Sequence, residues 1–294
     1  MGHNHNHPHS SSSNLKTAFF LNFAFAIIEF IGGILTNSTA IIAESFHDFG
    51  DSLSLGLSWW LEGYSKKKRS EKYSYGYKRF SLLAALINST ILITGSIIVI
   101  CIAVPRLLNP EPSNYTGMLI LAVLGILVNG VAALRLKKGN SLNEKVASWH
   151  LLEDVFSWIA VLAVSIINHF VEIAILDPIL AIVFTLIILL HVFRNFKQIV
   201  SVFLQGIPAN VDIKEVERKI KELNGVESVH DIHIWTMDNE YHVLTLHVVV
   251  KNKLPYSKMK KIKCEVKKIV GELNIQHVTV EIGEKSEKCD YINC

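Results

Sequence analysis

Two apolar stretches of this sequence each carry a histidine that precedes an aspartate by four residues. The pairs are His47 with Asp51 and His150 with Asp154. In a helix, residues four apart lie on one face, one turn apart, so each pair can offer an imidazole nitrogen and a carboxylate oxygen to the same ligand. Two such helices facing each other would provide two nitrogen and two oxygen donors, a set that suits tetrahedral zinc.

A polar side chain in an apolar helix can instead hydrogen-bond a neighbouring helix. One histidine alone would leave the two interpretations about even. The same pair in two stretches favours metal binding, because ionisable side chains inside a membrane span are costly and mark functional sites. Asp48 lies off the paired face of its helix and could line the same cavity, whereas Glu153 could pair with a loop lysine.

The elements that position these pairs follow from the distribution of charge. The chain has 294 residues and a mean hydropathy of +0.33. Residues 1–205 carry only 27 of its 55 charged side chains, whereas the much shorter segment 206–294 carries the other 28. Each of six apolar stretches is long enough, as a helix, to cross a hydrocarbon core about 30 Å thick. The stretches are 15–36, 38–62, 79–106, 114–136, 145–169 and 173–200. We therefore predict a membrane domain of six helices over residues 15–205.

Lysine and arginine are unevenly divided between the loops. The loops after the second and fourth stretches contain eleven of them, whereas the opposite loops contain only Arg106. Because basic loops remain on the cytoplasmic side, both termini should be cytoplasmic, including the histidine-rich tail of residues 1–14. The run Lys66–Arg69 is expected to contact anionic lipid. The net charge is only +3, and the basic residues lie in short runs rather than along one face, which argues against a nucleic-acid partner.

The composition changes at Gly206–Pro208, where we place the start of a cytoplasmic domain of residues 206–284. Helical periodicity at 211–223 and 257–273, with β-branched runs at 226–235, 241–250 and 275–282, gives the order αββαβ. This order predicts a small α+β domain of ferredoxin-like or metallochaperone-like type, with the helices on one face of a sheet. Strand alternation would place His230 and His233 on opposite faces unless the strand has a bulge.

Several motifs together resemble the cation diffusion facilitator family over nearly the whole chain. They are Ser-Phe-His-x-x-x-Asp-Ser at 45–52, Tyr-Gly-Tyr-Lys-Arg at 75–79, His-Leu-Leu-Glu-Asp at 150–154, Asp-Pro at 177–178 and Val-His-Asp-Ile-His-Ile-Trp at 229–235. The resemblance implies a homodimeric zinc/proton antiporter that works by alternating access, with the soluble domain dimerising in the cytoplasm. It implies that His47, Asp51, His150 and Asp154 bind the transported metal, and it places Asn22 near the pathway. Cd²⁺ or Co²⁺ could be transported in addition to Zn²⁺.

The resemblance also implies metal sites outside the membrane. It favours His230, His247, His277 and Glu284 as a cytoplasmic zinc site, although each histidine could equally be a solvated strand residue. A second site could combine Cys289 and Cys294, in the tail of residues 285–294, with His3, His5 and His7. The spacing of these cysteines is wider than Cys-x-x-Cys, so reduced thiols on a tail are the alternative. Some relatives have a loop histidine where this chain has Lys78, and we predict no metal site there.

Three other functions compete with transport. An intramembrane zinc-dependent hydrolase would keep three protein ligands and one open position on the metal, whereas this chain offers four matched ligands and no His-Glu-x-x-His motif. A membrane metal sensor would signal through its tail with little flux. A channel is disfavoured because a tight site with four ligands would hold the ion too long. We expect a bacterial plasma membrane, because no organelle signal is visible.

Overall fold

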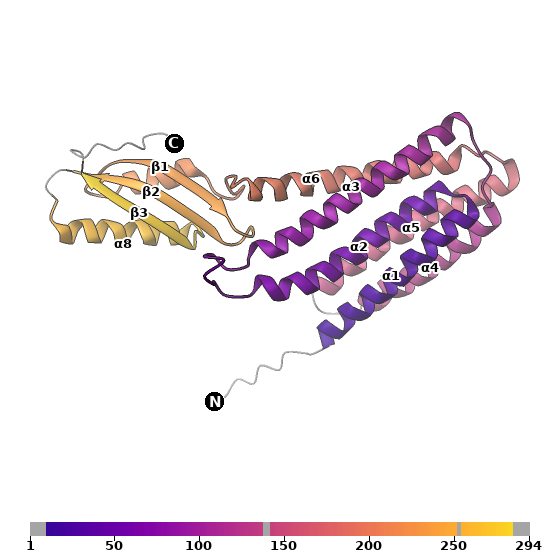
Figure 1. Ribbon diagram of the computed structural model, residues 1–294, viewed down its shortest axis with the longest axis horizontal. Helices are drawn as coiled ribbons and strands as arrows, with labels where there is room; N and C mark the ends of the chain where they lie inside the picture. Colours follow the sequence, from indigo (N-terminus) through magenta and orange to yellow (C-terminus); the bar gives the residue numbers. More distant parts are fainter. Residues whose placement is uncertain (1–9, 138–141, 252–253, 285–294) are drawn as a thin grey trace. The chain divides into compact units, whose positions relative to one another are not determined.

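The computed structural model describes residues 10–137, 142–251 and 254–284 (Figure 1). The chain divides into two compact units. The helical unit comprises Met1–Glu62 and Ala84–Phe196, and the C-terminal unit comprises Gly63–Leu83 and Lys197–Cys294. The C-terminal unit therefore includes the basic loop between the second and third apolar stretches as well as the end of the chain.

Each of the six apolar stretches forms a long helix. Their bounds are α1 Ser10–Thr36, α2 Thr39–Ser65, α3 Arg79–Leu108, α4 Tyr115–Lys137, α5 Leu142–Val171 and α6 Leu176–Phe203. By length and composition, five of these helices could cross a membrane, and α2 is the exception within the described residues. Helix α2 has 27 residues, but it carries the acidic residues Glu44, Asp48 and Asp51.

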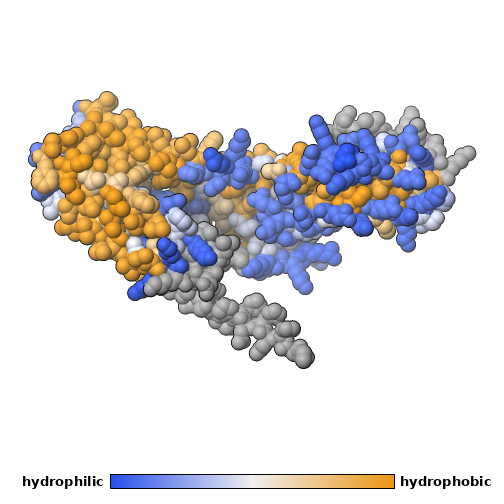
Figure 2. Space-filling view, turned by 180° about the vertical axis from the view of Figure 1, so that it is seen from behind, coloured by the Kyte–Doolittle hydropathy of each residue, from blue (hydrophilic) through white to orange (hydrophobic). Residues whose placement is uncertain are grey.

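The outer surface of the helical unit is apolar. Leu35, Phe170 and Leu190 are 71–80% exposed, and Figure 2 shows a broad apolar surface over this part of the chain. Exposed apolar areas of this extent mark contact with lipid or with another protein. Inside the unit, small residues allow the helices to approach closely. At Gly125 of α4, a Cβ atom would collide with the buried ring of Trp158 on α5.

Hydrogen bonds fix the beginning of α2. The chain turns at Asn37, whose φ is 53°, and Arg106 of α3 donates to the Asn37 carbonyl at 2.7 Å. Asp177, in the first turn of α6, accepts hydrogen bonds from Ser38 Oγ at 2.5 Å and from Thr39 N at 2.6 Å. A carboxylate at a helix N-terminus satisfies free N–H groups and complements the helix dipole. Helices α2 and α6 are therefore joined at this end.

The C-terminal unit has the predicted order αββαβ. Its elements are α7 Ile213–Lys221, β1 Val226–Thr236, β2 His242–Val250, α8 Tyr256–Glu272 and β3 His277–Glu284. Strand β2 lies in the middle of the sheet, antiparallel to β1 and parallel to β3. Apolar side chains of the two helices pack against alternate residues of the strands; among them are Val216, Ile220, Ile262, Val266, Leu244, Leu246 and Val280.

Strand β1 contains a bulge that the alternation rule did not anticipate. His230 pairs with His247 and His233 with Thr245, with a register shift between them. Asp231 has a φ of 50°, so one extra residue is accommodated in β1. The bulge is the condition under which His230 and His233 can share a face, and both occupy the face of the sheet opposite to the helices.

The loop before α3 docks onto the tip of the β1–β2 hairpin, within the C-terminal unit. The Nζ atom of Lys78 lies 3.1 Å from Asp238 Oδ2 and 4.6 Å from the centre of the Tyr241 ring. The rings of Tyr75 and His277 meet edge to face at 5.7 Å. Asp238 Oδ1 accepts a hydrogen bond from Tyr241 N at 2.7 Å, which closes the turn between β1 and β2. Lys78 thus holds a carboxylate of the C-terminal domain.

Candidate metal centre

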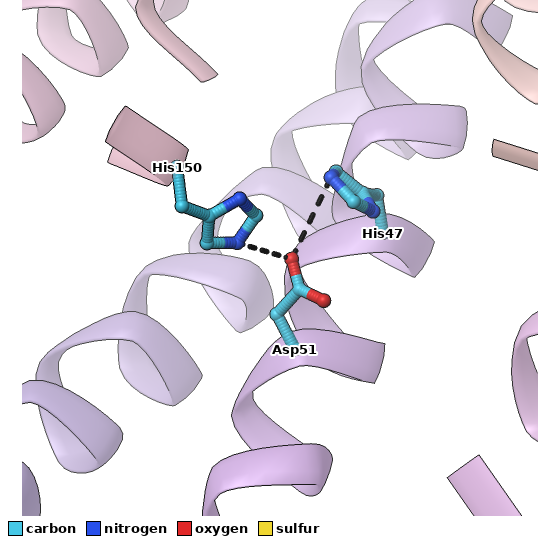
Figure 3. Close-up of side chains that lie close together, drawn as sticks. All are labelled: His47, Asp51 and His150. Carbon is cyan, nitrogen blue, oxygen red and sulfur yellow. Dashed lines mark ion pairs between the residues drawn. The ribbon is translucent and has the colours of Figure 1, made fainter. Parts of the chain in front are cut away.

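The first predicted pair lies one turn apart on α2, as its spacing requires. The Nε2 atom of His47 is 3.5 Å from Oδ2 of Asp51, and Figure 3 shows both side chains pointing away from the helix toward His150. Thr39 lies eight residues before His47, so the bonds that fix the start of α2 also fix the position of this pair along the helix.

The second pair comes from α5 and meets the first. His150 Nε2 lies 2.6 Å from Asp51 Oδ2, and the two imidazole rings are 5.8 Å apart and almost perpendicular. Asp154 Oδ1 lies 4.0 Å from His47 Nε2. The structure thus brings together all four predicted residues, which we call the metal centre. Its chemistry is that of two imidazole nitrogens and two carboxylates, a set found at zinc sites.

A second group of carboxylates lies beside the metal centre. Oxygen atoms of Glu44, Asp48 and Asp154 all lie within 4.8 Å of one another, and Glu29 of α1 is buried next to Asp48. We name Glu29, Glu44, Asp48 and Asp154 the acidic cluster. Asp48 was expected to line the pathway, but Glu29 and Glu44 were not predicted. Their charge within apolar stretches was the signal that could have identified them.

Asn22 of α1 packs against α2 at Asp48 and Ser52. Its Nδ2 atom donates to the Asp48 carbonyl at 3.3 Å and to Ser52 Oγ at 3.0 Å. Asn22 therefore contacts α2 at the residues that follow His47 and Asp51 in the sequence. Its predicted place near the pathway remains a prediction, because these contacts involve no side-chain oxygen of the metal centre.

The four residues expected to form a cytoplasmic zinc site are not brought together within one chain. The His230 and His247 rings face each other, with centroids 4.6 Å apart. His277 pairs with Val243 and Glu284 with Val250, at opposite ends of β3. Seven residues of strand separate them by about 23 Å. The expected grouping of four is therefore corrected to the pair His230–His247, beside which Glu281 lies on β3.

The second cytoplasmic site cannot be compared with the structure. His3, His5, His7, Cys289 and Cys294 lie outside the described residues. Sequence reasoning also passed over His242, which is buried at the start of β2. Its Nε2 atom lies 3.3 Å from Asn210 Nδ2. Burial lowers the pKa of His242 below its ordinary value, against the opposing effect of the Asp238 carboxylate.

Comparison with known proteins extends these observations. Residues 15–204 match the cation efflux transmembrane domain, and residues 208–284 match the cytoplasmic domain of cation efflux proteins. The chain is 33% identical to the cadmium, cobalt and zinc/H(+)-K(+) antiporter of Bacillus velezensis, over 99% of this chain and 94% of that protein.

Two further relatives are similar over most of their length. The metal cation efflux system protein CzcD of Cupriavidus metallidurans is 33% identical over 95% of this chain and 89% of that protein. The zinc transporter ZitB of Escherichia coli is 30% identical over 82% of this chain and 78% of that protein. The chain is thus an integral membrane transporter for efflux of divalent metal cations, rather than an enzyme, and it belongs to the cation diffusion facilitator family.

Proposed function

We propose that the protein exports Zn²⁺ and that the metal centre, His47, Asp51, His150 and Asp154, binds the ion during transport. The observation that carries this proposal is the convergence of the two His-Asp pairs, from α2 and α5, around Asp51 Oδ2. Nitrogen donors favour zinc over Mg²⁺ or Mn²⁺, which prefer sites made of oxygen alone. The names of the relatives include cadmium and cobalt, and we propose these ions as further substrates.

We further propose that protons are the counter-ion. A histidine or aspartate must lose its proton to bind a metal, so protons and zinc compete for the same atoms. Histidine titrates near neutral pH and can carry a proton across one transport cycle. Alternating access then releases zinc on the side where protons enter. The Bacillus velezensis relative is named for exchange with H⁺ and K⁺, which supports an exchange of cations.

The topology we propose has six spans, including α2, and places both termini in the cytoplasm. The unequal distribution of lysine and arginine between the loops supports this orientation. The acidic residues of α2 face α1 and α5 within the helical unit rather than lipid, which supports a span that is less apolar than its neighbours. We propose a bacterial plasma membrane, and bacterial relatives support it.

We propose that the cytoplasmic domain forms the dimer and binds zinc through His230 and His247. The matched cytoplasmic domain of cation efflux proteins and the open face of the sheet, where both histidines lie, support this arrangement. The membrane sensor and hydrolase alternatives receive no support from the relatives, which are named as antiporters and transporters.

Transport in proteoliposomes with an imposed proton gradient tests the proposed function. We expect His47→Ala and Asp154→Ala to abolish zinc flux, because each removes one of four ligands. Glu172→Gln, which alters an exposed acid just after α5, is the control and should transport at the wild-type rate. Wild-type flux in well-folded His47→Ala protein would refute the assignment of the metal centre.

A further inference from the structure

The acidic cluster has the geometry of a cation site. Glu44 and Asp48 lie one turn apart on α2, and Asp154 comes from α5. Their carboxylate oxygens lie within 4.8 Å of one another, and each residue is at most 2% exposed. Oxygens at this spacing can surround one ion at about 2.4–2.8 Å, the range of Ca²⁺ and of larger hard cations.

Glu29 provides a separate observation from a third helix. Its side chain is completely buried, and it faces the carboxyl group of Asp48. Its side chain hydrogen-bonds the carboxyl group of Asp48, and its oxygens have no other hydrogen-bond partner among the described residues. Two facing carboxyl groups without a basic partner need a proton or a cation between them, and Glu44 and Asp154 place two more acids beside them.

The free-energy cost of burying ionised carboxylates also requires a positive charge near the acidic cluster. An ionised carboxylate costs several kcal/mol inside a protein or membrane unless it is paired. Apart from the contact between Glu29 and Asp48, both oxygens of Asp48 and one oxygen of Asp154 have no hydrogen-bond partner in the described part of the chain. No lysine or arginine among the described residues forms an ion pair with any of the four. A proton or a bound cation would supply the missing charge.

We propose that Glu29, Glu44, Asp48 and Asp154 form a second cation site, which binds a hard, oxygen-preferring cation beside the zinc-binding metal centre. The donor set is all oxygen, in contrast to the two nitrogens and two carboxylates of the metal centre, so the two sites select different classes of ion. This inference rests on the proposed function, because it takes the metal centre as the zinc site.

Asp154 connects the two sites. One of its oxygens lies 4.0 Å from His47 Nε2 in the metal centre, and one lies within 4.8 Å of oxygens of Glu44 and Asp48. A carboxylate that turns toward zinc is a poorer ligand for the second cation, and the reverse also holds. Occupancy of one site therefore weakens the other, and by linkage the effect is reciprocal. This competition couples the export of zinc to the binding of a counter-cation.

Zinc binding to the purified full-length protein tests the inference, and the part of the binding that His47→Ala removes is taken as binding to the metal centre, because His230 and His247 are proposed to bind zinc as well. Binding is measured at constant pH and constant chloride concentration, with choline replaced by K⁺, Na⁺ or Ca²⁺. We expect at least one of these cations to weaken zinc binding to the wild type by about three- to tenfold. Glu29→Gln and Glu44→Gln, which keep the shape of each side chain, should each reduce this shift, and the double variant should lose it. Glu172→Gln should retain it.

The outcomes separate the two proposals. If His47→Ala binds zinc as the wild type does, the proposed function fails. If the wild type binds zinc through His47 but no cation weakens that binding, the carboxylates are neutralised by protons alone and the second site is overturned. A shift that persists unchanged in folded Glu29→Gln and Glu44→Gln also overturns it. If the double variant does not fold, the proposal is tested by the cation-induced shift in zinc affinity of the wild type and of the two single variants.

Discussion

The carboxylate of Asp177 ties the first turn of α6 to the first turn of α2, and its removal should weaken both the fold and the metal centre. Asp177 accepts hydrogen bonds from Ser38 Oγ, Thr39 N and Thr39 Oγ1 at 2.5–2.6 Å, and from Ala40 N at 3.3 Å. Asp177→Asn keeps the shape of the side chain but turns an N–H₂ group toward donors.

The magnitude follows from these bonds. A hydrogen bond to a charged group contributes about 1.5–3 kcal/mol, and at least two are lost, while the buried charge that needed them is also removed. We expect a loss of about 2–4 kcal/mol, or about 4–16 °C in the melting temperature for a unit of this size. His47 lies eight residues, about 12 Å, beyond Thr39, so a tilt of about 5° would displace it by about 1 Å. Metal–ligand distances tolerate about 0.2 Å, and zinc affinity should fall about 10- to 100-fold.

Thermal unfolding in detergent and zinc titration of the full-length protein measure the two effects. The control is Thr185→Val, which removes a buried hydrogen bond of 2.7 Å to Ala181 within α6 itself and should cost less than about 1.5 kcal/mol. If Asp177→Asn melts with the wild type, the account of the anchor is wrong. If it is destabilised but binds zinc with wild-type affinity, the anchor does not position the metal centre.

Two further predictions concern the C-terminal unit. Burial lowers the pKa of His242, so the unfolded chain binds the proton more tightly than the folded chain. The free energy of unfolding should therefore reach its full value above pH 6.5 and decrease as the pH falls below it. The melting temperature should change less between pH 7.5 and pH 5.5 in His242→Gln than in the wild type, and equal changes would contradict this reasoning. The ion pair between Lys78 and Asp238 is partly exposed. A double-mutant cycle with Lys78→Met and Asp238→Asn should therefore give a coupling energy of about 0.5–1 kcal/mol in thermal unfolding. If the effects of the two substitutions are additive, the contact contributes nothing to stability.

Local periodicity predicted the elements because it depends only on neighbouring residues. The six apolar stretches and the order αββαβ agree with the observed helices and strands within a few residues. The His-x-x-x-Asp spacing predicted that each pair shares a helical face. That the faces of α2 and α5 meet depends on packing between helices, for which small residues such as Gly125 are necessary; the sequence alone left this as a hypothesis.

Contacts between distant segments and departures from ideal geometry were beyond the sequence patterns. Lys78 and Asp238 are separated by 160 residues, and no periodicity relates them. The bulge at Asp231 reverses the face on which the following residues of β1 lie, because side chains alternate with a period of two. Aspartate tolerates positive φ better than most residues, but that tolerance does not identify a bulge in advance.

The acidic cluster, in contrast, was within reach of the same reasoning that found the metal centre. Glu44 and Asp48 have the spacing of His47 and Asp51, offset by three residues along α2. At 3.6 residues per turn, this offset rotates the second pair by about 60° around the helix, so α2 presents two adjacent stripes of ligands. A helix that packs between two neighbours can direct one stripe to each interface. Asp154 of α5 contacts both, and for that reason the two ligand sets compete instead of acting independently.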